Sequence, residues 1–149
     1  GTVPFAVATT EAPHYRRVAI TRMRAEGITT AEIRKTPVGR GFGIRDGNGI
    51  MFISHTGDIC PSGFLPVVAG NVRSAHIVEI YRQSELFRKI RQTAEFKGRC
   101  GRCEFREICG GSRARAYAAF GDYLAEDPAC GYEPRSRGEE LLVEPGFQT

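Results

Sequence analysis

The stretch Cys100-Gly-Arg-Cys103-Glu-Phe-Arg-Glu-Ile-Cys109, followed at a distance by Cys130, decides how the C-terminal half of this sequence folds. It holds four of the five cysteines of the 149-residue chain. Two thiolates in a C-x2-C turn, a third just before a helix and a fourth from a later loop can complete a tetrathiolate shell, which suits zinc or an iron–sulfur cluster. Cys100, Cys103, Cys109 and Cys130 are therefore the candidate metal ligands.

A disulfide framework in a secreted domain is the alternative interpretation of these cysteines. Five is an odd number, cysteine is sparse for a disulfide scaffold, and 149 residues can bury a core without covalent cross-links. A metal site with reduced thiols indicates a reducing compartment, so we expect a cytoplasmic protein. The spacing leaves zinc and iron–sulfur open, because the C-x5-C interval matches neither paired zinc knuckles nor a ferredoxin C-x2-C-x2-C run.

Composition and charge narrow the possible partners. The chain is 41% hydrophobic and 26% charged, as is usual for one soluble domain, and no apolar run approaches the roughly twenty residues of a membrane span. Between residues 82 and 115, ten Lys and Arg face four Glu. Solvated helix faces, or compensation for a negatively charged cluster, explain this excess without nucleic acid, because no basic-aromatic binding motif accompanies it.

Upstream of the cysteines, the pattern predicts two helices and a glycine-rich turn. The first helix starts near Thr9 and Thr10 and ends at Gly27. Its apolar residues recur at helical spacing: Tyr15, Val18, Ala19 and Met23. The second helix covers 30–35 and ends at Pro37, after which three glycines within 39–43 predict a flexible turn rather than a phosphate-binding loop.

The middle of the sequence predicts a small antiparallel sheet. Turn signals at 46–49 and 55–58 flank a run at 50–53 that is typical of a buried strand, and a second strand is expected at 59–60. His55 is expected to be an ordinary turn residue. We therefore expect a hairpin or meander of two or three short strands.

Helices are predicted on both sides of the cysteine stretch. Residues 74–82 and 84–92 give two short helices or one kinked helix, and 113–120 gives a helix capped by Ser112 and ended by Gly121. The amino end of the last helix favours negative charge beside the third thiolate. The fold class is thus α+β, a short antiparallel hairpin or meander with flanking helices and a cysteine-rich metal-binding C-terminal region.

Three segments of the sequence resemble a known family. They are Phe52-Ile-Ser-His-Thr-Gly-Asp-Ile-Cys-Pro-Ser-Gly-Phe-Leu-Pro66, Gly70-Asn-Val-Arg73 and Cys109-Gly-Gly-Ser-Arg-Ala-Arg-Ala-Tyr117. Over roughly residues 50 to 133, the chain resembles the C-terminal SPASM or twitch extension of radical SAM enzymes. Within that group it is most similar to the branch with the enzyme of nitrite reductase haem biosynthesis. The resemblance implies a core remnant or linker at 1–45, an auxiliary-cluster domain at 46–133 and a tail at 134–149.

The resemblance also implies the ligand set. One auxiliary 4Fe–4S cluster maps onto Cys100, Cys103, Cys109 and Cys130, with zinc as a substitute. A second auxiliary cluster is not expected, because Arg113 stands where fuller members carry a ligand and Cys60 has no companion cysteine.

The catalytic C-x3-C-x2-C motif of the family does not occur in this chain. The fragment alone is therefore expected to be inactive, within a parent oxidoreductase that uses S-adenosyl-L-methionine and a further 4Fe–4S cluster.

The partners implied by the resemblance follow from that assignment. They are the missing radical SAM core of the same protein, a peptide or tetrapyrrole substrate, and an electron donor such as ferredoxin or flavodoxin. Two other hypotheses remain open at this point. One is a zinc-stapled structural or interaction module, and the other is a basic nucleic-acid-binding knuckle, which its salt-dependent retention on nucleic acid would reveal.

Overall fold

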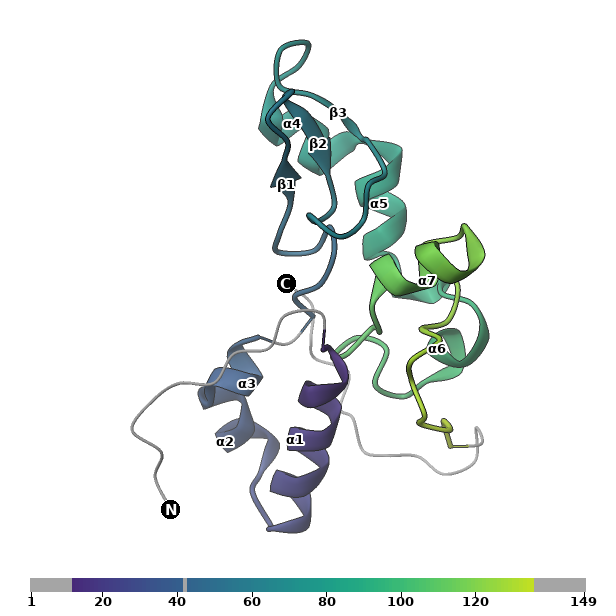
Figure 1. Ribbon diagram of the computed structural model, residues 1–149. Coiled ribbons are helices and arrows are strands. Elements are labelled where there is room, and N and C mark those ends of the chain that lie inside the picture. Colours follow the sequence, from purple (N-terminus) through teal and green to yellow (C-terminus); the bar gives the residue numbers. More distant parts are fainter. Residues whose placement is uncertain (1–11, 42, 136–149) are drawn as a thin grey trace.

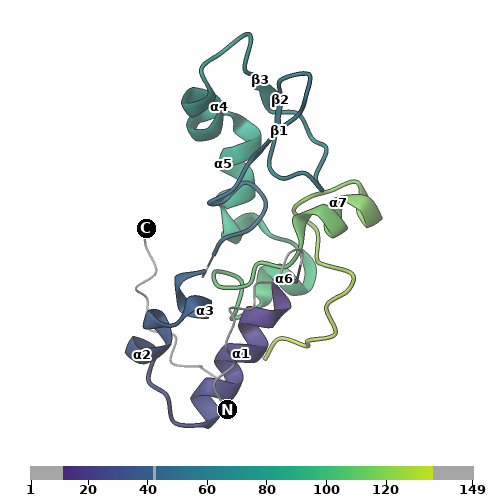
Figure 2. The ribbon, with the colours of Figure 1, turned by 60° about the vertical axis from the view of Figure 1, so that its left-hand side comes forward.

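The computed structural model of the protein describes residues 12–41 and 43–135. Helices α1, α2 and α3 gather at one end, the sheet with α4 and α5 forms the other, and α6 and α7 lie beside the junction (Figures 1 and 2). The elements are α1 (His14–Ala25), α2 (Thr30–Lys35), α3 (Pro37–Arg40), β1 (Phe52–Ile53), β2 (Asp58–Cys60), β3 (Gly70–Asn71), α4 (Ile77–Gln83), α5 (Glu85–Arg91), the 3-10 turn η1 (Thr93–Glu95), α6 (Gly98–Arg102) and α7 (Arg113–Phe120).

The residues that helix α1 buries are not the ones that its apolar pattern indicated. The helix ends as expected, because Gly27 adopts a φ of +79° just beyond it. Tyr15 and Val18 are each 40% exposed, whereas Ile20 is buried and packs with Ile33 against Ile108 of the cysteine stretch. The expected start at Thr9 and Thr10 lies outside the described residues.

A short helix replaces part of the predicted glycine-rich turn. Thr36 caps α3 by accepting a hydrogen bond of 3.1 Å from the Gly39 amide, and Pro37 occupies the first turn, where its missing N–H costs nothing. A side chain at Gly39 would place its Cβ 2.0 Å from the Ile33 carbonyl oxygen. The glycine therefore allows close packing of α3 on α2 and does not make this segment a turn.

The sheet is antiparallel in the order β1-β2-β3, as the hairpin or meander prediction required. Ile59 in the central strand is fully buried and packs against Ile80 and Phe87. Residues 50–53, predicted as a buried strand, instead contain the edge strand β1, and its Phe52 and Ile53 are 44% and 42% exposed. The prediction of burial was wrong because an apolar run alone does not distinguish a central strand from an edge strand.

Helices α4 and α5 are two helices rather than one kinked helix. Ser84 adopts an extended conformation between them, and its hydroxyl accepts a hydrogen bond of 3.4 Å from the Phe87 amide. Phe87 and Ile90 are fully buried, as their spacing predicted. Among the described residues, none of the helices is long and apolar enough to cross a membrane.

The cysteine stretch contains a short helix in addition to turns. Helix α6 carries Cys100 within the expected loop, and α7 follows as predicted, with Ser112 accepting from the Arg115 amide at 3.2 Å and Gly121 ending it at a φ of +68°. Helices and a small antiparallel sheet therefore confirm the α+β class.

Candidate metal centre

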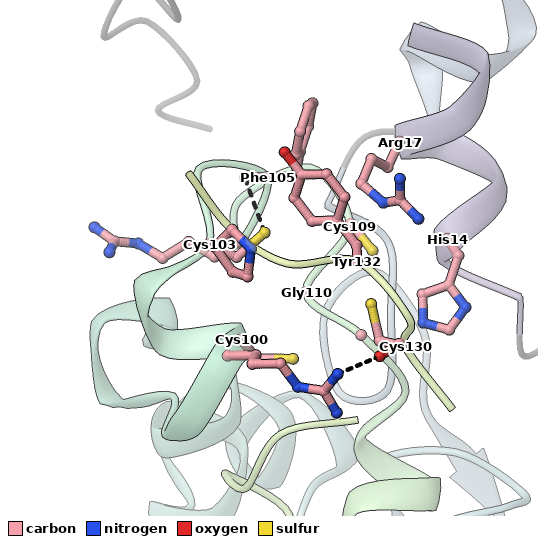
Figure 3. A pocket seen from close by; sticks show the side chains of 13 residues that line it. His14, Arg17, Cys100, Cys103, Phe105, Cys109, Gly110, Cys130 and Tyr132 are labelled. Atoms are coloured by element: carbon pink, nitrogen blue, oxygen red, sulfur yellow. Dashed lines mark hydrogen bonds between the residues drawn. The ribbon is translucent and has the colours of Figure 1, made fainter. Parts of the chain in front are cut away.

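Four cysteines line one pocket, although they come from separate parts of the chain (Figure 3). Cys100 lies in α6, Cys103 caps its carboxyl end, Cys109 follows in the next turn, and Cys130 arrives on the returning loop. Their sulfurs face a common space in Figure 3. Cys60, buried in β2 opposite Phe52, is not among the lining residues.

A buried carboxylate fixes the loop that returns Cys130 to the pocket. Asp127 is fully buried and accepts hydrogen bonds from the Ser112 and Ala129 amides at 2.7 and 3.1 Å and from Arg115. Burial alone raises the pKa of Asp127, but hydrogen bonds from His14, Arg115 and the two amides outweigh it and hold that pKa well below the usual range. Asp127 therefore stays ionised and connects the loop to the start of α7.

The pocket sulfurs accept hydrogen bonds from nearby N–H groups. The Asp127 amide and the Arg113 guanidinium each lie 3.4 Å from the Cys100 sulfur, and the Phe105 amide lies 3.4 Å from that of Cys103. Burial raises the pKa of the Cys103 thiol to about 12 and raises that of Cys109 as well. A metal cation must therefore displace protons from these sulfurs, which is the usual coupling of metal binding to deprotonation.

Aromatic and cationic side chains cover one side of the pocket. The guanidinium of Arg17 stacks 4.3 Å above the ring of Tyr132, whose edge contacts Phe105 at a centroid distance of 5.6 Å. The Tyr132 hydroxyl donates to the Glu104 carboxylate, and burial followed by this contact raises the pKa of Tyr132 to about 12. These groups lie along the upper side of the pocket in Figure 3.

Glycine at position 111 leaves room beside the Cys100 sulfur. Its φ is +63°, and a Cβ there would lie 3.0 Å from the Cys100 sulfur and 2.8 Å from Arg113 Nη2. The absence of a side chain at Gly111 thus lets the backbone approach the Cys100 sulfur closely.

Sequence reasoning missed several residues of this site. His14 and Arg17 come from α1, which had been predicted as a core remnant or linker outside the cysteine domain. Asp46 was predicted only as a turn residue, yet its carboxylate accepts from the Arg113 and Ala114 amides at 3.0 and 3.1 Å. These contacts join segments far apart in the sequence, so local patterns carried no signal for them.

The volume of the pocket and the arrangement of its side chains bear on whether a metal group fits. It encloses about 360 Å³ of space between protein atoms, part of it open to solvent. Within residues 12–41 and 43–135, no three His, Cys, Asp or Glu side chains converge closely enough to hold a single metal ion. The described residues therefore show no ready single-ion site, and the metal-binding character expected of this region stays a prediction.

Residues 45–104 match the SPASM family, described as an iron–sulfur cluster-binding domain. The match includes the sheet, α4, α5 and the first two pocket cysteines. The chain thus carries a SPASM iron–sulfur cluster-binding domain, which is the class that the four-sulfur pocket also indicates.

Heme synthases and a peptide cyclase are among the proteins that are similar to this chain. An AdoMet-dependent heme synthase of Nitratidesulfovibrio vulgaris is 45% identical over 83% of this chain and 34% of its own length. A PqqA peptide cyclase of Rhodopseudomonas palustris is 39% identical over 55% of the chain and 23% of its own. A pre-heme d1 synthase of Dinoroseobacter shibae is 35% identical over 59% of the chain and 23% of its own length. The resemblance to the haem branch is confirmed.

Proposed function

We propose that this chain binds one 4Fe–4S cluster through Cys100, Cys103, Cys109 and Cys130 and is the auxiliary-cluster domain of a radical SAM oxidoreductase. The observation that carries the proposal is that four cysteines, from α6 and its C-cap, the following turn and the returning loop, line one pocket. The SPASM match supports the nature of the group. The role we assign is electron transfer and substrate positioning.

The spacing of the side chains favours a cluster over zinc. At a Zn–S distance of about 2.3 Å, tetrahedral geometry brings the four sulfurs to within roughly 3.8 Å of one another. No three candidate ligands in the described part of the chain converge closely enough for one ion, although all four sulfurs share one pocket. The described residues thus offer no ready zinc site, and the SPASM match supports a cluster instead.

The protein residues around the pocket define what such a cluster can do. A 4Fe–4S cluster supplies one-electron transfer when bound. With a cysteine for each iron, no iron is left for substrate, so we assign outer-sphere electron transfer and the holding of nearby loops. Arg17, Tyr132 and Phe105 line one side of the pocket, and Asp127 fixes the loop of Cys130.

A longer protein is needed for catalysis in this proposal. The chain spans about a third of the length of the heme synthase that it matches. We propose that residues 46–133 form its auxiliary-cluster domain and that a radical SAM core, with S-adenosyl-L-methionine and its own 4Fe–4S cluster, lies elsewhere in the parent. The parent acts on a tetrapyrrole or a peptide, as the names of the relatives indicate for those proteins, and takes electrons from a ferredoxin or flavodoxin.

An exposed apolar surface offers a contact for that core. Met51, Phe52 and Phe64 line one surface hollow and are each at least 38% exposed, and β1 is an edge strand. Such a patch is unusual for an isolated domain and typical of an interface.

Anaerobic reconstitution with iron and sulfide tests the proposal. We expect broad visible absorption from the reconstituted protein and its loss in the Cys103→Ser variant, with Cys60→Ser as the matched control. A colourless protein that takes up one zinc and no iron would instead support the zinc-stapled module.

A further inference from the structure

One fully buried guanidinium lies beside the proposed cluster ligands, and the function proposed above does not account for it. Arg113 is 0% exposed and is the largest fully buried side chain of the described residues. A buried charge is costly unless an opposite charge or a set of hydrogen bonds compensates it. The surroundings of Arg113 therefore show what this cation is positioned to do.

The protein offers Arg113 neutral partners and one sulfur. Its Nη1 donates to the carbonyl oxygens of Tyr123 and Ala125 at 3.0 and 2.7 Å, and the guanidinium lies 4.4 Å above the ring of Phe96. Its Nη2 donates to the Cys100 sulfur at 3.4 Å. These contacts hold the guanidinium in one orientation, with one N–H group directed at a pocket sulfur.

The carboxylate of Asp122 acts on this cation electrostatically but forms its ion pair with Lys97. None of the ion pairs formed among the described residues involves Arg113, and its Nε lacks a hydrogen-bond partner there. The sulfur of Cys100 is thus the one contact of Arg113 that becomes an anion when a metal group binds. Arg113 is a counter-charge placed for the metal-bound state.

We propose, resting on the cluster-binding function above, that Arg113 is a positioning residue that raises the reduction potential of the auxiliary cluster. Reduction by an external one-electron donor adds one negative charge beside Arg113 and breaks no bond. A fixed cation and a hydrogen bond to a ligand sulfur stabilise that added charge, and both effects are strong where water is excluded. The neighbouring amide of Asp127, also 3.4 Å from the Cys100 sulfur, acts in the same direction.

A redox titration of the reconstituted protein, poised with dithionite and followed by electron paramagnetic resonance, tests this role. We expect Arg113→Gln to shift the midpoint potential to more negative values and Arg113→Lys, which keeps the charge but not the planar fork, to fall between Gln and wild type. The control is Arg102→Gln, which removes a charge that is 62% exposed and bonded to Glu133 at 3.7 Å, and it should leave the potential unchanged. An Arg113→Gln protein with full iron content and the wild-type potential would overturn the proposal.

A measurement on the wild-type protein decides the matter if Arg113→Gln does not fold. In protein labelled with ¹⁵N-arginine, pulsed resonance of the reduced cluster should show a weak nitrogen coupling that disappears in Arg113→Lys. A wild-type cluster without this coupling contradicts the role of Arg113 but leaves the proposed function intact. Wild-type protein that takes up no iron removes both.

Discussion

The cysteines of this chain occupy two kinds of environment at the scale of single residues. Four line one pocket with hydrogen-bond donors around their sulfurs, whereas Cys60 lies in the central strand, where burial raises the pKa of its thiol. A cysteine that is buried away from a metal site behaves as a small apolar residue. The two groups should therefore respond differently to the same substitution.

Replacing Cys60 and Cys103 by serine separates these environments. We expect Cys60→Ser to retain the wild-type iron content after anaerobic reconstitution and Cys103→Ser to lose most of it, because only the second removes a pocket sulfur. Iron analysis per folded chain is the measurement. Equal losses in the two variants would mean that Cys60 belongs to the centre.

Adding one methyl group at Gly111 tests the packing around Cys100. Gly111→Ala forces an L residue to a φ of +63° and places its Cβ between the Cys100 sulfur and Arg113, so we expect a loss of stability of about 1–3 kcal/mol and weaker iron retention. Chemical denaturation of the reconstituted protein measures the first effect. Gly131→Ala, whose Cβ meets no atom within 4 Å, is the control.

The carboxylate of Asp127 is expected to stabilise the loop that returns Cys130 to the pocket. Asp127→Asn keeps the shape but removes the charge that Arg115 binds and one acceptor of the buried network, so we expect a loss on the order of 2 kcal/mol. Denaturation midpoints of wild type and variant give the difference. A variant as stable as wild type would show that the returning loop is held by other contacts.

At the scale of elements, we expect the cysteine region to depend on the proposed cluster more than the sheet does. The sheet, α4 and α5 share a core of Ile59, Ile80 and Phe87, whereas the region from 97 to 133 is short helices and loops arranged around the pocket. In the proposed function, binding of the cluster supplies the free energy that offsets the ordering entropy of this region.

Amide hydrogen exchange with and without an iron chelator tests this difference. We expect residues 52–60 and 77–91 to stay protected in the metal-free protein and residues 97–133 to lose protection. Uniform protection in verified metal-free protein would show that residues 97–133 fold without a bound metal.

Local patterns predicted most elements of this fold. Helix α7, with its Ser112 cap and Gly121 end, and the pair α4 and α5 follow from spacing and capping rules, which act within a few residues. Strand β1 was predicted as buried and is exposed, because the position of a strand within a sheet depends on its partners. The four cysteines were found from spacing alone. Arg113 and Asp127 were not assigned their roles, because those depend on contacts across the fold.

At the scale of the whole molecule, the N-terminal helices are part of the cysteine region's structure. Ile20 and Ile33 pack against Ile108, and Arg17 of α1 covers the pocket over Tyr132. The domain boundary predicted at residue 46 separates the pocket from these contacts. Residues 46–133 therefore contain every proposed ligand but not every residue that supports them.

Truncation tests how far the pocket depends on α1 to α3. We expect a chain of residues 46–149 to bind iron less completely than the full chain and to lose it faster to a chelator, because Ile108 becomes exposed and Arg17 is absent. The rate of iron release is the measurement. Equal rates would show that residues 46–149 hold the centre independently.

The central claim is that the four pocket cysteines hold one 4Fe–4S cluster, and Mössbauer spectroscopy of the anaerobically reconstituted, ⁵⁷Fe-labelled chain tests it most directly. We predict about four irons per chain in a single spectrum of a 4Fe–4S cluster with sulfur ligands at every iron. A protein that folds fully with one tetrahedral metal ion per chain, or with no iron bound, would contradict the claim.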